Sequence, residues 1–148
     1  MHMVLRTIQG IRKAEDSADL RTWLRALPGA PEVHEVFALA CAQHGDERPT
    51  WAYVEADATE GLARRRCLAC ATTVPLLDSA ERWNYPPMWS CLGCSHSIAE
   101  LAVALSLPDG THVEWLALGA RCVECGRLAG LTDLVVAKVA LADVLTGL

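Results

Sequence analysis

The residues best suited to chemistry in this 148-residue chain are seven cysteines and one histidine that fall into four pairs. Two residues separate the members of every pair, and the pairs are Cys41/His44, Cys67/Cys70, Cys91/Cys94 and Cys122/Cys125. This spacing lets both side chains of a tight turn, or of one helical turn, converge on a tetrahedral metal ion. Because each pair supplies half of such a site, the four pairs predict two metal sites.

The sequence leaves open which pairs share an ion. Twenty residues separate Cys70 from Cys91, at the upper end of the spacing that is typical of a zinc site. We therefore expect the second and third pairs to share one ion, and the first and fourth pairs to share the other. A sequential scheme, which joins the first pair to the second and the third to the fourth, and an interleaved scheme use the same residues.

The second, third and fourth pairs resemble the knuckles of zinc ribbons, over residues 62–127. The fourth is also similar to the rubredoxin knuckle, because Gly126 follows its second cysteine. Ala71 and Ser95 occupy this place in the other two knuckles. The resemblance implies stacked β-hairpins around structural Zn²⁺, and it does not imply a particular partner.

Thiolate-rich sites with four protein ligands are structural, whereas catalytic zinc keeps one position open for water. We therefore expect two zinc ions and no enzyme activity, with iron as the alternative metal because four thiolates also hold iron. Cys41 can also be read as an ordinary buried thiol, and His44 as a histidine favoured by a helix C-terminus. His96 and His112 are the substitute ligands.

One enzyme signature has a partial likeness here. His112 and Glu114, followed by Cys122 and Cys125, have the residue types of the zinc deaminase signature. Only seven residues separate Glu114 from Cys122, and Arg121 replaces the proline of the signature. We therefore reject deaminase chemistry.

The segment before Gly45 has the apolar spacing of helices. Residues 20–27 present one apolar face behind a suitable N-cap at Ser17, and Pro28 and Gly29 end this helix. A second helix is predicted over residues 31–44, with Cys41 and His44 on its core-facing side. It opens with acidic residues where a helix-turn-helix reader would contact nucleic acid, which favours an αα-hairpin packed on the metal module.

Short segments separated by turn residues follow Gly45 and predict strands. Alternating apolar residues before and after Pro108-Asp109-Gly110 predict a hairpin, residues 51–58 and 128–136 predict further strands, and residues 138–147 predict a closing helix. The predicted class is α+β, in one compact unit. An N-terminal helical segment, 1–45, would pack on a cysteine-rich antiparallel β module with a short C-terminal helix, 46–148.

The composition indicates a folded chain without a membrane span. It is 52% hydrophobic and 21% charged, which excludes disorder, and its apolar stretches fall short of the roughly 18 residues of a spanning helix. No secretory signal pattern is found, so we expect a cytoplasmic protein with reduced cysteines. The formal net charge of −5 would become about −8 with both sites filled, which disfavours general binding of nucleic acid.

Basic and aromatic residues gather before and between the knuckles. They are Arg64, Arg65, Arg66, Arg82, Trp83, Tyr85 and Trp89. Such residues suit phosphate contacts and base stacking, so a nucleic-acid-binding zinc ribbon is the alternative function. We favour aromatic side chains that cover a small metal core, and a non-enzymatic protein-interaction or adaptor module with an unidentified protein partner. The sequence carries no indication of the oligomeric state.

Overall fold

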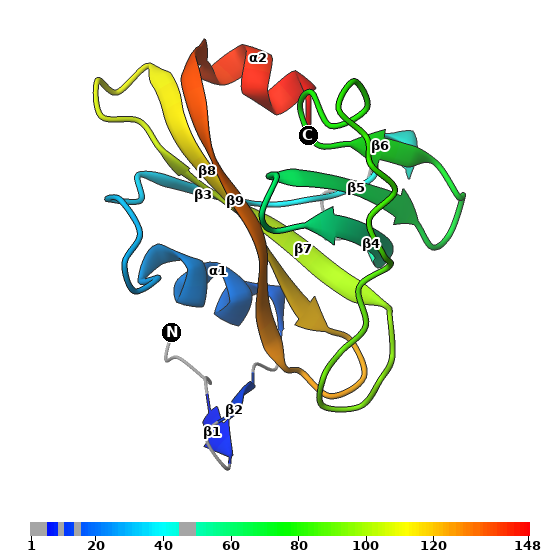
Figure 1. Cartoon of the computed structure of the whole chain (residues 1–148). Helices are drawn as coiled ribbons and strands as arrows, with labels where there is room; N and C mark the ends of the chain where they lie inside the picture. Colours follow the sequence, from blue (N-terminus) through cyan, green and yellow to red (C-terminus); the bar gives the residue numbers. More distant parts are fainter. Residues whose placement is uncertain (1–5, 9–10, 14–15, 45–49) are drawn as a thin grey trace.

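The computed structural model describes residues 6–8, 11–13, 16–44 and 50–148, and of residues 6–8, 11–13 and His44 only the backbone (Figure 1). The elements are β1 (Arg6–Ile8), β2 (Ile11–Lys13), α1 (Ser17–Arg25), β3 (Glu35–Ala38), the 3₁₀ turn η1 (Ala42–His44), β4 (Ala52–Asp57), β5 (Leu62–Cys67), β6 (Thr73–Pro75), β7 (Ala99–Ser106), β8 (His112–Cys122), β9 (Leu128–Ala140) and α2 (Leu141–Thr146). None of these helices has the length and apolar character needed to cross a membrane.

Seven of the described strands form one antiparallel sheet. Its order is β6-β5-β4-β7-β8-β9, and β3 pairs with β7 beside β4, while β1 and β2 form a separate two-stranded sheet. The predicted hairpin is present, because β7 pairs with β8 from Ala99↔Cys122 to Ser106↔Trp115. Gly110 takes a φ of +83° in its turn, a conformation that glycine adopts without strain. The fold is therefore mostly antiparallel sheet with two short helices.

The two faces of the central hairpin belong to two apolar clusters. Ala102 and Ala104 of β7 face α1, where Leu20 and Leu24 are fully buried, and Leu101, Val103 and Leu105 face the larger cluster on the other side. This division follows from the alternation of side chains along a strand. The central strands are thus covered on both sides.

Helix α1 confirms the first predicted helix, with a different cap. Asp16 is the N-cap, and its carboxylate accepts a hydrogen bond from the backbone N–H of Asp19 at 3.0 Å. Ser17, the predicted cap, is the first residue of the helix. The cap therefore lies one residue earlier than predicted.

The predicted second helix, residues 31–44, is wrong. Its middle forms β3, which pairs with β7 from Glu35↔Leu105 to Ala38↔Ala102, and only Ala42–His44 are helical. Val36 packs in the cluster beside α1 and Phe37 against the cluster on the other face. Because both faces of this short strand are apolar, its sequence shows no two-residue alternation.

The N-terminal segment therefore contributes a strand to the sheet, across the division predicted at residue 45. The strand predicted at 51–58 is present as β4, and the strand predicted at 128–136 is present as β9, which continues to Ala140. The predicted closing helix is shorter than expected and corresponds to α2. One of the two helices expected before residue 45 is present among the described residues.

Candidate metal centres

Four cysteine sulfur atoms form the first cluster, which we call the tetrathiolate cluster. The Sγ atoms of Cys91, Cys94, Cys122 and Cys125 all lie within 4.8 Å of one another. The Sγ atoms of Cys91 and Cys125, and those of Cys94 and Cys122, are 3.5 Å apart. A disulfide would bring two sulfurs to about 2.05 Å, whereas a tetrahedron with Zn–S bonds of about 2.3 Å has edges of about 3.8 Å. The cluster could therefore hold a tetrahedral metal ion.

Three cysteines form the second cluster, the three-cysteine cluster. The Sγ atoms of Cys41, Cys67 and Cys70 lie within 4.8 Å of one another, and those of Cys41 and Cys70 are 3.7 Å apart. Cys41 and Cys67 are buried and Cys70 is exposed. The backbone of His44 lies in η1, directly after Cys41, and its side chain lies outside the described residues. These three sulfurs could also hold a metal ion.

The expected pairing was wrong. Cys91/Cys94 lies with Cys122/Cys125, and Cys67/Cys70 lies with Cys41, as in the sequential scheme. Cys67, at the end of β5, pairs with Ala52 of β4. Ala52 also pairs with Ala99 of β7, and Ala99 pairs with Cys122 at the end of β8. Two strands therefore lie between Cys67 and Cys122, a distance of about 14 Å at the usual strand spacing. Cys91 and Cys94 come before β7 and next to the end of β8, so they meet Cys122 instead of Cys67.

The three cysteine knuckles share one backbone conformation. In each, the N–H of the first cysteine donates to the carbonyl five residues later, and the N–H of the fifth residue donates back to the first cysteine. The fifth residues are Ala71, Ser95 and Gly126, with φ of +60°, +67° and +78°. Knuckles without the glycine therefore form the same turn as the knuckle that has it.

Two exposed or half-buried thiols have a pKa well below its ordinary value. The pKa of Cys70 is lowered to about 6, first by the hydroxyl group of Thr72, which lies 3.1 Å from Sγ. The pKa of Cys94 is lowered to about 6, first by the backbone N–H of His96 and then by its ring, 3.3 Å from Sγ. Burial raises the pKa of Cys122 to about 12. A coordinated metal ion would ionise this thiol as well.

The sequence-based reasoning missed the role of the residue that follows each second cysteine by two positions. Thr72 and His96 hold this place, and both contact the sulfur of the cysteine before them. Their carbonyls, like that of Arg127 in the third knuckle, accept the bond from the first cysteine. The shared position was a signal that the sequence offered, because polar residues recur there in all three knuckles.

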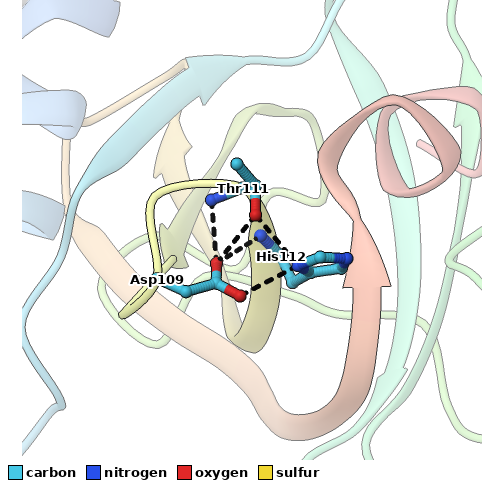
Figure 2. A network of polar contacts seen from close by, with 3 residues as sticks. All are labelled: Asp109, Thr111 and His112. Carbon is cyan, nitrogen blue, oxygen red and sulfur yellow. Dashed lines mark hydrogen bonds and ion pairs between the residues drawn. The ribbon is translucent and has the colours of Figure 1, made fainter.

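The structure does not place His112 near either cluster of described cysteines. It begins β8, and Cys122 ends it ten residues later, about 34 Å along an extended strand. Figure 2 shows its ring against Asp109 and Thr111 in the turn between β7 and β8. The deaminase-like combination of His112 with Cys122 is therefore not assembled.

The contacts in Figure 2 also differ from a catalytic triad. Nδ1 of His112 lies 2.9 Å from both Asp109 Oδ2 and Thr111 Oγ1, whereas a triad histidine contacts its carboxylate and its nucleophile through opposite ring nitrogens. Asp109 Oδ1 accepts the backbone N–H groups of Thr111 and His112 at 2.8 and 2.7 Å. The N–H of His112, followed by that of Thr111, lowers the pKa of Asp109 below its usual range. The network closes the hairpin turn.

Two arginines of the predicted partner surface form ion pairs within the molecule. Arg64 donates to both oxygens of Glu55, at 2.8 and 3.2 Å. Arg82 donates to both oxygens of Asp78, at 3.0 and 3.1 Å. Carboxylates of the same molecule therefore largely neutralise these two positive charges.

The other two arginines also contact groups within the molecule. Arg65 is half-buried and donates to the carbonyls of Ala40 and Leu148. Arg66 is exposed, and its guanidinium lies 5.2 Å from the centre of the Tyr53 ring. The run of three arginines is thus divided among separate intramolecular contacts.

The three aromatic residues of the predicted surface have different environments. Trp83 is half-buried beneath the guanidinium of Arg64, 4.3 Å from its ring centre. Trp89 packs against the larger apolar cluster. Tyr85 is 83% exposed. The expectation of aromatics that cover the interior therefore holds for Trp89 and fails for Tyr85.

No protein-family model matches this chain, and no curated protein or solved structure matches it. The assignment of the two centres therefore depends on the arrangement and chemistry of their own side chains.

Proposed function

We propose that this protein binds two structural zinc ions. The tetrathiolate cluster would hold one ion, and Cys41, Cys67, Cys70 and His44 would hold the other. The observation that carries the proposal is the placement of four cysteine sulfurs within 4.8 Å of one another, with two of the sulfur pairs 3.5 Å apart. Zinc is favoured because closed thiolate sites in stable folds are a typical zinc environment, and iron is the alternative.

The role proposed for the metal-supported fold is that of a non-enzymatic protein-interaction or adaptor module. Four protein sulfurs would occupy all four positions of a tetrahedral ion in the tetrathiolate cluster and would leave none for a substrate. Apolar side chains that a folded protein usually buries are presented to solvent, with Leu92 87% and Met88 46% exposed. The ion pairs of Arg64 and Arg82 weigh against nucleic acid, because binding to phosphate would have to replace them.

Metal analysis of paired cysteine variants tests the two centres. The wild type should carry two equivalents of zinc. The double variant Cys91→Ser/Cys122→Ser should retain one, and Cys67→Ser/Cys122→Ser should retain none. The pairing first expected from the sequence predicts that Cys91→Ser/Cys122→Ser retains no zinc, because Cys91 and Cys122 would then belong to different ions. A visible ferric thiolate absorption with stoichiometric iron would contradict zinc.

The fourth ligand of the second centre has its own test. His44→Ala should lose one zinc equivalent to a competing chelator under conditions in which the wild type keeps both. His96→Ala is the matched control, because His96 contacts Cys94 from outside the group of four sulfurs. If His44→Ala retains two ions with unchanged affinity, His44 is not a ligand.

A titration with single-stranded DNA and RNA at low salt separates the two proposed partner classes. We expect no binding, because Arg64 and Arg82 are already ion-paired within the protein. Binding that weakens steeply with salt, and that Arg66→Ala reduces, would favour the nucleic-acid alternative.

A further inference from the structure

A groove with a volume of about 500 Å³ lies beside the tetrathiolate cluster. We call it the knuckle groove. Its walls are residues 87–92, which lead into the second knuckle, residues 127–131, at the start of β9, and Ala56 of β4. A volume of this size is typical of a binding site for a small ligand or a few peptide residues.

Large apolar side chains form both the floor and the rim of the knuckle groove. Leu128 and Leu131 are buried, Trp89 is half-buried, and Met88 and Leu92 are 46% and 87% exposed. Leu92 lies within the turn between Cys91 and Cys94, so a metal-held loop presents it to solvent. Burial of such a side chain is favourable, which makes this rim a suitable contact for a partner.

The groove also offers hydrogen-bond donors without matching acceptors. Trp89, Ser90 and Arg127 line it, and none of the three side chains has a hydrogen-bond or ion-pair partner within the part of the chain that the structure describes. Arg127 is the one basic residue of the lining. An indole N–H, a hydroxyl and a guanidinium beside an apolar floor complement a ligand that has a carboxylate next to an apolar group.

Arg127 lies over the second knuckle. A methyl group at Gly93 would come within 3.4 Å of its Cδ atom and 3.6 Å of Nη1, so the absent side chain leaves room for the arginine. A filled tetrathiolate cluster carries about −2 charge, which offsets long-range attraction of acidic molecules. The complementarity is therefore short-range, and it favours one carboxylate in direct contact with Arg127.

From these observations we infer that the knuckle groove binds a segment of a partner protein in which a large apolar side chain stands next to an aspartate or glutamate. The inference rests on the proposed interaction role and gives that role a surface and a partner chemistry. The apolar side chain fills the space between Trp89 and Leu131, Leu92 covers it, and the carboxylate accepts hydrogen bonds from Arg127.

Selection from a random decapeptide library on the immobilised zinc-loaded protein tests this inference. Enriched peptides should combine a large apolar residue with an adjacent acid. Leu92→Asp and Arg127→Glu should each weaken their binding at least about tenfold, as expected for residues at the centre of a contact. Replacement of the peptide's acid by lysine should weaken binding to the wild type and restore binding to Arg127→Glu.

Matched controls isolate the groove. Val135→Asp places a charge at an equally exposed apolar residue outside the lining, and Arg21→Glu reverses an exposed arginine on α1, so both should bind like the wild type. Zinc content is measured for every variant. Leu92→Asp keeps the test decisive if Arg127→Glu loses zinc, because Leu92 is almost fully exposed.

Three results would overturn the inference: no enriched peptide, enrichment of basic peptides, or peptides that bind Leu92→Asp as tightly as the wild type. The last result would leave the interaction role in place and move it to another surface. A wild type without bound metal would instead contradict the proposed zinc centres, whatever peptides it bound.

Discussion

The fifth residue of each knuckle shows how one backbone conformation decides local stability. Ala71, Ser95 and Gly126 all have positive φ, and the N–H of each closes the turn on the first cysteine of its knuckle. The left-handed conformation costs a residue with a Cβ atom about 1–2 kcal/mol, and it costs glycine almost nothing. Two of the three knuckles therefore carry strain that the third avoids.

We predict that Gly126→Ala lowers the free energy of unfolding of the zinc-loaded protein by about 1 kcal/mol. Ala71→Gly should raise it by a smaller amount, because glycine also gains entropy in the unfolded chain. Urea denaturation with zinc present measures both effects. As a control, Gly29→Ala changes another positive-φ glycine, in the segment after α1 and outside the knuckles, and it should alter stability without altering zinc affinity. Equal zinc affinity in Gly126→Ala and the wild type would contradict a role of this turn in the site.

At the scale of elements, the contact between α1 and β8 depends on a missing side chain. A Cβ atom at Gly119 would lie 2.8 Å from Cδ2 of Leu24, and Leu24 is fully buried. A Cβ atom at Gly130, the cross-strand neighbour of Gly119, would have Trp23 as its nearest contact among the described residues, at 4.0 Å. The two glycines thus have different reasons to be small.

We predict that Gly119→Ala lowers the free energy of unfolding by about 1–3 kcal/mol, because the added methyl group displaces Leu24 and with it α1. Gly130→Ala should be neutral within about 0.5 kcal/mol. Both values come from urea denaturation, and near-ultraviolet circular dichroism of the tryptophans reports the position of α1. Equal stability of the two variants would show that Leu24 adapts without cost.

The error at β3 belongs to the same scale. The apolar residues of 33–44 recur at a helical interval, yet backbone pairing with β7 decides their conformation. Strand propensity depends on neighbours on both faces, and β3 has α1 on one side and the larger apolar cluster on the other. The hairpin of β7 and β8 was predictable, because its turn and its alternation lie within one continuous segment.

At the scale of the whole molecule, both candidate metal centres lie on one row of the sheet. The row runs from Cys67 through Ala52 and Ala99 to Cys122. One residue along, Glu100 and Arg121 form an ion pair with Nη2–Oε1 at 2.9 Å and side chains only 12% and 10% exposed. Trp51 Nε1 also donates to Glu100, at 3.3 Å. A largely buried polar link thus spans the strands between the centres.

We predict that Glu100→Gln lowers the free energy of unfolding by at least about 2 kcal/mol, because it leaves the charge of Arg121 buried without a counter-ion. Asp78→Asn, which breaks the exposed pair with Arg82, should cost less than about 1 kcal/mol. Urea denaturation of the zinc-loaded variants measures the difference. Similar losses in both variants would mean that solvent screens the Glu100–Arg121 pair as well.

The sequence by itself determined which cysteines could bind metal, since two-residue spacing makes each of the three knuckles a local unit that needs no distant contact to assemble. It also determined the hairpin and α1, whose signals are equally local. Only the tertiary structure decided which pairs meet, because strand order, and not the number of residues between pairs, brings Cys41 to Cys67 and Cys91 to Cys122. The same holds for the knuckle groove, since the segments that line it are far apart in the chain and meet only in the folded sheet.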